Sequence, residues 1–243
     1  MRIDAENTHY RELNEQIRAA VQDGATEIVL DKVRGQRYIG AGLGNGVHIT
    51  VNGVPGNDLG AFMDGAEISV NGNGQDGVAN TMNAGRIVIH GGAGDILGYS
   101  MRGGQVFVRG DVGYRAGIHM KAYEDRFPIL VVGGRAGDYL GEYMAGGVLV
   151  VLGMEREGDS YVGEWVGTGM HGGVMYLRGQ IEEWRTGAEV GIAELDDADW
   201  RQLSDILTDY CTALRIENPG YARKEFHKVY PQTARPYGTL YAY

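Results

Sequence analysis

The sequence has little cysteine, little proline and no long apolar run. Cys211 is the one cysteine among 243 residues, which excludes an internal disulfide, an iron–sulfur cluster or a thiolate zinc site made by this chain alone, because each needs several thiolates. No segment approaches the roughly 18 apolar residues of a membrane-spanning helix, and the segment after Met1 lacks the apolar run of a signal peptide. We therefore expect a soluble, cytoplasmic protein.

Positive charge is also in short supply. There are 22 basic against 32 acidic residues, which gives a net charge of −10. Such a chain is repelled by phosphate backbones and by anionic lipid, so we expect neither nucleic acid nor a membrane as a partner. Glycine, in contrast, is abundant at 41 residues against only 5 prolines, a composition that fits neither collagen nor a flexible linker because 43% of the residues are hydrophobic.

The glycines and methionines in the middle of the chain repeat at positions that differ by 19. The repeating methionines are Met63, Met82, Met101 and Met120, and the repeating glycines are Gly53, Gly72, Gly91 and Gly110. Each glycine ends a short strand-like run, and the pattern continues beyond Gly110 with insertions of five and seven residues. A unit this short cannot bury its own apolar face, so the units must stack as coils of a β-solenoid. At least seven coils are legible.

Strand alternation predicts which side chains face the solenoid interior. The first inward column contains Ile49, Ile68, Ile87, Val106, Leu130, Leu149 and Met175, and the second contains Val51, Val70, Ile89, Val108, Val132, Val151 and Leu177. The repeated methionines are expected to form a third inward column rather than a ligand-binding face. The glycines are expected at coil corners, where the chain needs positive φ or room for the next coil.

Helical periodicity is found only on either side of the repeat. Residues 7–22 read as an amphipathic helix that stops before Gly24, and a second helix begins at Asp196 or Asp197 and runs to Leu214. We therefore divide the chain into an N-terminal helix (1–24), a β-helix domain (25–180), and a C-terminal region (181–243) with a helix and a Tyr-rich extended arm after Pro219.

Three enzymatic or ligand-binding motifs are matched only in part. Residues 72–77 place glycines as in a dinucleotide-binding loop, but the next coil rather than a helix follows them. Residues 91–95 match half of a calcium-binding repeat, but the step is 19 and Tyr114 interrupts the column, so we expect these Asx residues to hydrogen-bond their own turns. A hexapeptide-repeat acyltransferase requires an aliphatic residue at every sixth position, whereas here only one strand of each coil is plainly aliphatic.

No catalytic constellation is evident in the sequence. The six histidines are dispersed, and we interpret them as solvated or structurally hydrogen-bonded, although His119 and His171 both flank the repeated methionine. Cys211 is expected to be a small buried hydrophobe. We therefore assign no catalytic, cofactor-binding or metal-binding residue to this chain. A β-helix enzyme that uses a carboxylate-lined groove is a less favoured alternative, since the acidic residues are scattered.

The repeat resembles the GXGXG domain at the C-terminal end of the glutamate synthase large subunit. Its most specific part is residues 137–153, with Glu142-Tyr143-Met144-Ala145-Gly146-Gly147 followed by a Val/Leu run and Gly153. The domain also resembles the β-helical subunit of formylmethanofuran dehydrogenase, whose coils share the stretch from Ala116 to Met120. In both families the domain is a right-handed, single-stranded parallel β-helix with a structural role, which implies an all-β core of about seven coils flanked by α-helices.

The resemblance implies partners rather than activity in this chain. Glutamate synthase needs an N-terminal catalytic cysteine, FMN and an iron–sulfur cluster, whereas this chain holds only the last domain. It is similar to a stand-alone, non-catalytic subunit of a split complex, which implies a glutaminase subunit and an FMN-binding synthase subunit that hold those cofactors and convert glutamine and 2-oxoglutarate to glutamate. A structural component of a formylmethanofuran dehydrogenase-type assembly is the alternative.

The outward-facing column predicts how the solenoid is covered. It changes from polar to apolar along the stack, through Thr50, Ser69, Val88, Phe107, Val131, Val150 and Tyr176. An apolar outer stripe must be covered, and we expect the C-terminal helix around Leu203 and Leu207 to cover it. The Tyr-rich arm is then expected to contact the partner subunits.

Overall fold

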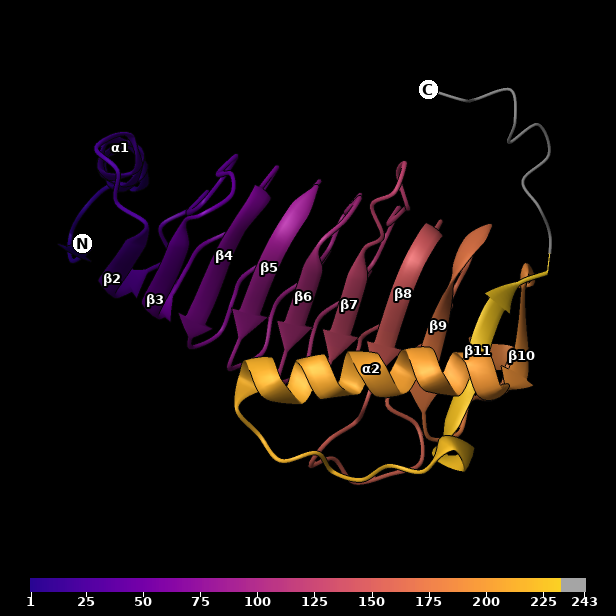
Figure 1. The fold of residues 1–243 in the computed structure, drawn as a ribbon. Helices are drawn as coiled ribbons and strands as arrows, with labels where there is room; N and C mark the ends of the chain where they lie inside the picture. The colour runs from indigo at the N-terminus through magenta and orange to yellow at the C-terminus, as the bar shows by residue number, and fades with distance from the viewer. Residues whose placement is uncertain (233–243) are drawn as a thin grey trace.

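The chain folds into one continuous parallel β-solenoid, seen in a computed structural model that describes residues 1–232 (Figure 1). The strands are β1 (Arg2–Asp4), β2 (Glu27–Arg34), β3 (His48–Val54), β4 (Asp64–Asn71), β5 (Ala84–Ile89), β6 (Gln105–Val108), β7 (Ile129–Val132), β8 (Ala145–Val151), β9 (Gly172–Arg178), β10 (Val190–Glu194) and β11 (Phe226–Pro231). Two α-helices accompany them, α1 (Tyr10–Gln22) and α2 (Asp197–Leu214), with 3₁₀ turns η1 (Glu183–Arg185) and η2 (Arg223–Glu225).

The strands pair in the register that the repeat predicts. From β1 to β9 every neighbouring pair is parallel, and Ile49 lies opposite Ile68, which lies opposite Ile87. The same ladder continues from Ile87 to Met175 through β6, β7 and β8. The seven expected strands are thus confirmed. They enclose about six turns rather than seven coils, because seven stacked strands are separated by six connections.

All three predicted inward columns lie in one core. Both strand columns belong to a single buried cluster, and Met63, Met82, Met101 and Met120 are completely buried within it. Met144 and Met170 extend the methionine column past the two insertions. The insertions therefore leave the interior unshifted, and Arg126 of the first one bonds Asp64 at the start of β4 on the outside (Nη1–Oδ1 3.2 Å).

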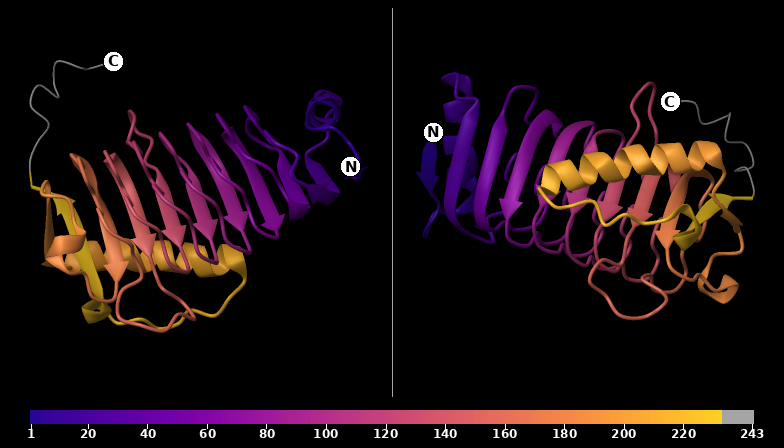
Figure 2. Two further views of the ribbon diagram at one scale, coloured as in Figure 1. Left: turned by 180° about the vertical axis from the view of Figure 1, so that it is seen from behind. Right: turned by 60° about the horizontal axis from the view of Figure 1, so that its bottom comes forward.

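Helix α2 covers the apolar part of the outer face, as the column predicts. It begins with a capping box between Asp196 and Asp199 and lies across the strands (Figures 1 and 2). Its buried residues Leu203, Ile206, Leu207, Tyr210, Cys211 and Leu214 form a second cluster with Val88, Phe107, Val131, Val150 and Tyr176. Thr50 and Ser69 lie outside this cluster, so the polar start of the column remains uncovered. No helix among residues 1–232 is both long enough and apolar enough to span a bilayer.

A buried polar group fixes the start of α2 on the sheet. The Asp199 carboxylate accepts hydrogen bonds from the Tyr176 hydroxyl (2.9 Å) and from Lys228 Nζ (2.8 and 2.9 Å). Burial alone would raise the pKa of Asp199, but the bonds from Lys228, the Asp196 backbone and Tyr176 outweigh it and the pKa is lowered. Burial and the charge of Asp199 raise the pKa of Tyr176. Helix α2, β9 and β11 are therefore joined by an ionised carboxylate.

The two ends of the solenoid are built differently. At the N-terminal end α1 packs Leu13, Ile17 and Ala20 into the core, and β1 precedes it at the edge of the sheet. At the C-terminal end β11 pairs antiparallel with β9, and β10 pairs antiparallel with β11. The expected extended arm after Pro219 is wrong for Phe226–Pro231, because these residues form β11, an interior strand of the sheet. The rest of that arm, residues 233–243, lies outside the described residues.

The glycine corners that follow the strands are only partly as expected. Gly53 has positive φ, but Gly72, Gly91 and Gly110 do not. A Cβ atom at Gly110 would lie 2.9 Å from the backbone nitrogen of Gly92, and one at Gly91 would lie 2.8 Å from the carbonyl oxygen of Gly72. These corners need glycine because the backbone of the preceding coil approaches closely, not because of a left-handed conformation.

Candidate interaction surface

A second edge of every coil carries the left-handed residues. This left-handed edge comprises residues 38–43, 58–63, 77–82, 96–101, 115–120, 139–144 and 165–170. In each segment the first, third and fifth residues have φ between 51° and 74°. The middle of these three is Gly or Ala throughout, whereas the other two carry Asp, Ile, Arg, Tyr, Trp, Phe, Thr, Ser or His as well as Gly.

Along this edge, the backbone N–H groups of successive left-handed residues donate in turn to the following coil and to the preceding coil. In the fifth segment the backbone N–H groups of Arg115 and His119 donate to Asp138 and Glu142 of the following coil (2.9 and 3.0 Å). The N–H of Gly117 between them donates to Leu97 of the preceding coil (2.7 Å). The edge is thus a second hydrogen-bonded ladder, and it holds its outward side chains on a rigid base.

Exposed aromatic side chains gather on this edge in its last four coils. We define the aromatic patch as Tyr99, Arg115, His119, Tyr139, Tyr143 and Trp165. The His119 ring stacks on Tyr143 (centroids 5.3 Å apart) and meets the edge of Tyr99 (6.0 Å), while Tyr139 stacks on Trp165 (6.3 Å). Trp165 is 50% exposed and Tyr143 is 46% exposed. The rings are preordered yet open to solvent.

One charged side chain belongs to the patch and is itself fixed. The Arg115 guanidinium lies 4.7 Å from the centre of the Tyr139 ring and its Nε donates to Glu142 Oε2 (2.8 Å). The sequence pattern singles out Tyr143 and His119 only as parts of motifs. The stacking of the coils brings them to one surface, where aromatic residues stand in register with glycines of other coils.

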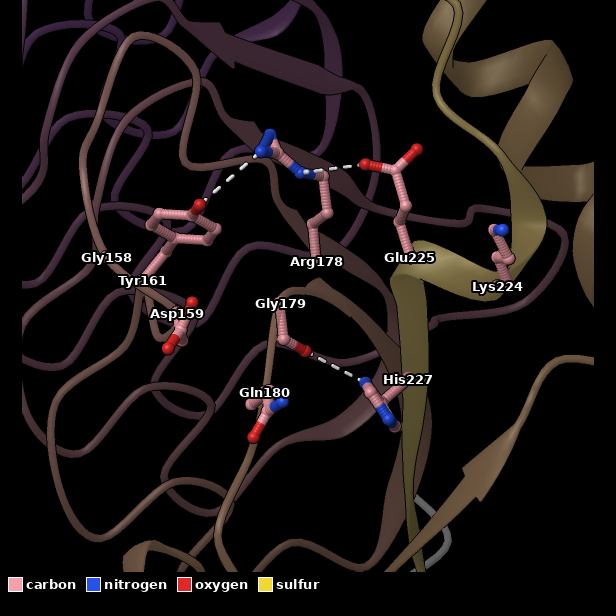
Figure 3. Close-up of a pocket in the computed structure, with 9 residues that line it drawn as sticks. All are labelled: Gly158, Asp159, Tyr161, Arg178, Gly179, Gln180, Lys224, Glu225 and His227. Carbon is pink, nitrogen blue, oxygen red and sulfur yellow. Dashed lines mark hydrogen bonds and ion pairs between the residues drawn. The ribbon is translucent and has the colours of Figure 1, made fainter.

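A polar pocket of about 280 Å³ lies at the C-terminal end, between the coil after β8 and the turn before β11 (Figure 3). Arg178 is its central residue: the guanidinium lies between the rings of Tyr161 (5.0 Å) and Tyr221 (4.3 Å), donates to the Leu152 carbonyl (2.7 Å), and faces Glu225 (3.7 Å). His227 contacts the Gly179 carbonyl through Nδ1 (2.8 Å). These groups satisfy one another, so the pocket serves chiefly to join β11 to the last coil.

A second open pocket lies along the glycine corners near the end of α2, lined by Asn73, His90, Arg109, Asp111, Glu155 and Arg156 among others. Burial lowers the pKa of His90, and the charges of Arg215 and Arg109 lower it further. Asp111 Oδ1 accepts bonds from the Arg135 backbone (2.7 Å) and from Arg156 Nε (2.9 Å). The seven-residue insertion is thereby tied to an earlier coil.

The Asx residues do not close their own turns, and that expectation is wrong. Asp76 Oδ1 accepts the backbone N–H of Asp95 (2.9 Å), Asp95 Oδ1 accepts that of Tyr114 (2.8 Å), and Asp138 Oδ1 accepts that of Glu164 (2.9 Å). Each carboxylate therefore bridges one coil to the next. Within residues 1–232, no three His, Cys, Asp or Glu side chains cluster as a metal site would require.

The two histidines beside the methionine column and the glycine-rich loop at residues 72–77 make structural contacts within the fold. His171 Nδ1 lies 3.1 Å from the Gly169 carbonyl, and His119 is in the aromatic patch, so the two histidines that flank the methionine column make different contacts. The segment after Gly77 continues into β5 without a helix, unlike a dinucleotide-binding loop. Cys211 is buried, as expected, and burial raises the pKa of its thiol.

The strand ladder, the glycine corners and the left-handed edge together define a glycine-repeat parallel β-solenoid. Residues 6–234 match the family described as GXGXG motif, and the chain belongs to that family. An uncharacterized protein of Methanocaldococcus jannaschii, MJ1350, is 44% identical over 98% of this chain and 95% of its own length.

A solved structure shares the fold. It is the formyltransferase/hydrolase complex (FhcABCD) from Methylorubrum extorquens in complex with methylofuran, and one of its chains aligns with a TM-score of 0.60, covering 89% of this chain and 85% of that one. At 19% identity the likeness extends to the fold alone.

Proposed function

We propose that this chain is a non-catalytic structural subunit of a split glutamate synthase-like complex. It would brace a glutaminase subunit against an FMN-dependent synthase subunit, whose FMN and iron–sulfur cluster would carry the conversion of glutamine and 2-oxoglutarate to glutamate. The observation that carries the proposal is the rigid left-handed edge with its solvent-exposed aromatic patch, a composition that supports contact with another protein. Membership of the GXGXG family is compatible with this role, and the resemblance of the Glu142–Gly147 motif is the reason for preferring the glutamate synthase type.

A second candidate is a structural subunit of a formylmethanofuran dehydrogenase-type assembly. The fold shared with a chain of the Methylorubrum extorquens complex favours it. Both candidates give this chain the same mechanical role and differ in the enzymes that it joins. In either case the chain would work among cytoplasmic enzymes, which agrees with its low cysteine content.

Reconstitution with defined partners tests the proposal. The chain would be co-expressed with the glutaminase and FMN-synthase subunits from the same genome, and in parallel with the corresponding formyltransferase/hydrolase subunits. We expect a stable complex with the first set by size-exclusion chromatography with light scattering, and glutamine-dependent glutamate formation that falls when this chain is omitted. A complex with only the second set would favour the alternative, and no complex with either set would refute the structural role.

A further inference from the structure

The aromatic patch combines two features that the fold itself does not require. Its residues Arg115, His119, Tyr139, Tyr143 and Trp165 all have left-handed backbone conformations, which disfavour every side chain with a Cβ atom. Glycine occupies the same positions in other coils, since Gly169 corresponds to Tyr143 and Gly77 corresponds to Trp165. Large rings are thus held in an unfavourable backbone where glycine also fits, which points to a role outside folding.

The composition of the patch is that of a protein-binding surface. Trp, Tyr and Arg are the residues that dominate interface energetics, above all where they are preordered by contacts within their own subunit. Here the stacked pairs His119/Tyr143 and Tyr139/Trp165 fix the rings before any partner arrives.

The charges around the patch select the chemistry of the partner. The 3₁₀ turn η1 lies against its last coil, because the Val166 N–H donates to the Arg185 carbonyl (2.9 Å). We define the rim as Asp138, Glu142 and Glu164, which neighbour patch residues in sequence, together with residues 182–185. The patch and the rim carry five carboxylates, those of Asp138, Glu142, Glu164, Glu182 and Glu183, and the guanidinium groups of Arg115 and Arg185. Both guanidinium groups are already engaged, with Glu142 and Glu182. Among residues 1–232, Glu164 and Glu183 take part in no ion pair.

Cation–π contacts within the protein indicate which cation can bind the rings of the patch. Within residues 1–232, four arginines lie over tyrosine or tryptophan rings: Arg115 over Tyr139 (4.7 Å), Arg178 over Tyr221 (4.3 Å), Arg185 over Trp184 (4.5 Å) and, further away, Arg11 over Tyr10 (5.9 Å). A planar guanidinium can stack on an aromatic face while it bonds a carboxylate, which an ammonium does less well. Exposed rings beside uncompensated carboxylates are therefore matched to arginine.

We propose that the aromatic patch docks a partner subunit through an arginine-bearing surface of that subunit, with a guanidinium group stacked on Trp165, guanidinium groups paired with Glu164 and Glu183, and the exposed edge of Tyr143 in contact with the same surface. The proposal rests on the proposed function for the existence of a partner, and adds where the partner binds and with what chemistry.

Glycine substitutions separate docking from folding. We expect the double variant Tyr143→Gly, Trp165→Gly to bind the purified glutaminase and synthase subunits with a dissociation constant at least tenfold higher than wild type, measured by calorimetry on the full chain. Its thermal unfolding midpoint should stay close to that of wild type, since glycine relieves the left-handed backbone. The matched control is Phe62→Gly, an exposed aromatic residue at the same position of an earlier coil, outside the patch, which should bind as wild type does.

Charge reversal tests the chemistry of the partner. Glu164→Lys with Glu183→Lys should weaken binding at least tenfold and reduce its dependence on salt, whereas Glu217→Lys, in the connector after α2, should not. Stronger binding by the first pair would show that the partner surface is acidic and would overturn the proposal.

The remaining outcomes are also decisive. Wild-type assembly with equal affinity in the double glycine variant would overturn the docking site and leave the proposed function standing. A wild-type chain that binds neither partner set would refute the proposed function, and the docking site with it. A wild-type dimer in analytical ultracentrifugation that dissociates in the double glycine variant would assign the patch to a second copy of this chain and overturn the heterologous partner.

Discussion

The glycine corners and the left-handed edge of the same coils use glycine for opposite reasons. At the corners, Gly72, Gly91 and Gly110 have no positive φ, yet the backbone of the preceding coil leaves no room for a Cβ atom. At the left-handed edge, side chains as large as Tyr and Trp accept positive φ because they point into open solvent. At these three corners, close packing rather than backbone conformation therefore makes glycine indispensable.

The largest expected effect is the loss of a corner glycine. We predict that Gly91→Val lowers the free energy of unfolding by roughly 3 kcal/mol, because its side chain would overlap Asn73 and the Gly72 carbonyl. The matched control is Gly42→Ala at the left-handed edge, where φ is +70° but nothing lies within 4 Å of the new Cβ. It should cost only about 1 kcal/mol. Denaturant unfolding would measure the free energy of unfolding of both variants. Equal losses of stability would contradict the claim that the corner depends on close packing more than the left-handed edge does.

An intermediate effect is expected where an Asx side chain bridges two coils between the corner and the left-handed edge. Asp76→Ala removes the acceptor of the Asp95 N–H and should lower the free energy of unfolding by about 1 kcal/mol. Gln75→Ala, at the exposed neighbouring position, is the control and should be near neutral. Hydrogen exchange at the Asp95 amide should accelerate in the first variant only; unchanged exchange would contradict the bridge.

A smaller effect of pH is expected at the corner that holds Asp111. Burial raises the pKa of its carboxyl, but the bonds from Arg156 and from the Arg135 backbone are stronger and the pKa lies below its usual value. A depressed pKa stabilises the folded state above the unfolded value of about 3.9. That contribution is lost as the pH falls through the folded pKa. Because the side chain is half exposed, the contribution should be below about 1 kcal/mol.

The variant Asp111→Asn isolates this contribution. Asn73 makes the corresponding bond to Gly92 in an earlier coil (2.9 Å), so an amide can serve as the acceptor. We expect the variant to lose less stability than wild type between pH 6 and pH 2, as measured by thermal unfolding. Identical acid profiles would show that Asp111 has an ordinary pKa.

The smallest expected effect concerns a residue of the left-handed edge that is not glycine. Ser100→Gly removes a Cβ from a residue with φ of 52°. Relief of the left-handed backbone, about 1–2 kcal/mol, is offset by the greater freedom of glycine in the unfolded chain, about 0.4–1 kcal/mol. The variant should therefore be as stable as wild type or up to about 1 kcal/mol more stable in denaturant unfolding. A clear loss of stability would show that the serine side chain supports the edge.

The parts of the fold that could be predicted from sequence are those that repeat. The constant repeat step fixes strand register, so the columns that contain Ile49, Val51 and Met63 followed directly. Capping chemistry placed the start of α2 at Asp196 or Asp197, and the structure has Asp196 as the N-cap. The left-handed edge was missed because its signature is conformational: Tyr139 and Gly77 share a backbone geometry but no side-chain property.

Other predictions were wrong or missing because they depend on contacts between coils or at the C-terminal end of the solenoid. Asp76 looks like an ordinary turn residue in sequence, and only stacking brings the Asp95 N–H within reach. The segment from Phe226 to Pro231 has no partner nearby in sequence, so its place between β9 and β10 could not be read from a local pattern. The aromatic patch likewise depends on coils that lie one or more full repeats apart in the chain.

The reversal of strand direction at β11 has a consequence for the size of the particle. A parallel stack in perfect register is a template that each new coil could extend, and two such ends could join into a filament. Because β11 pairs antiparallel with β9, it occupies the position at which the next parallel coil would pair with β9. The edge of the last coil is thereby covered, and the parallel ladder of the repeat stops at β9.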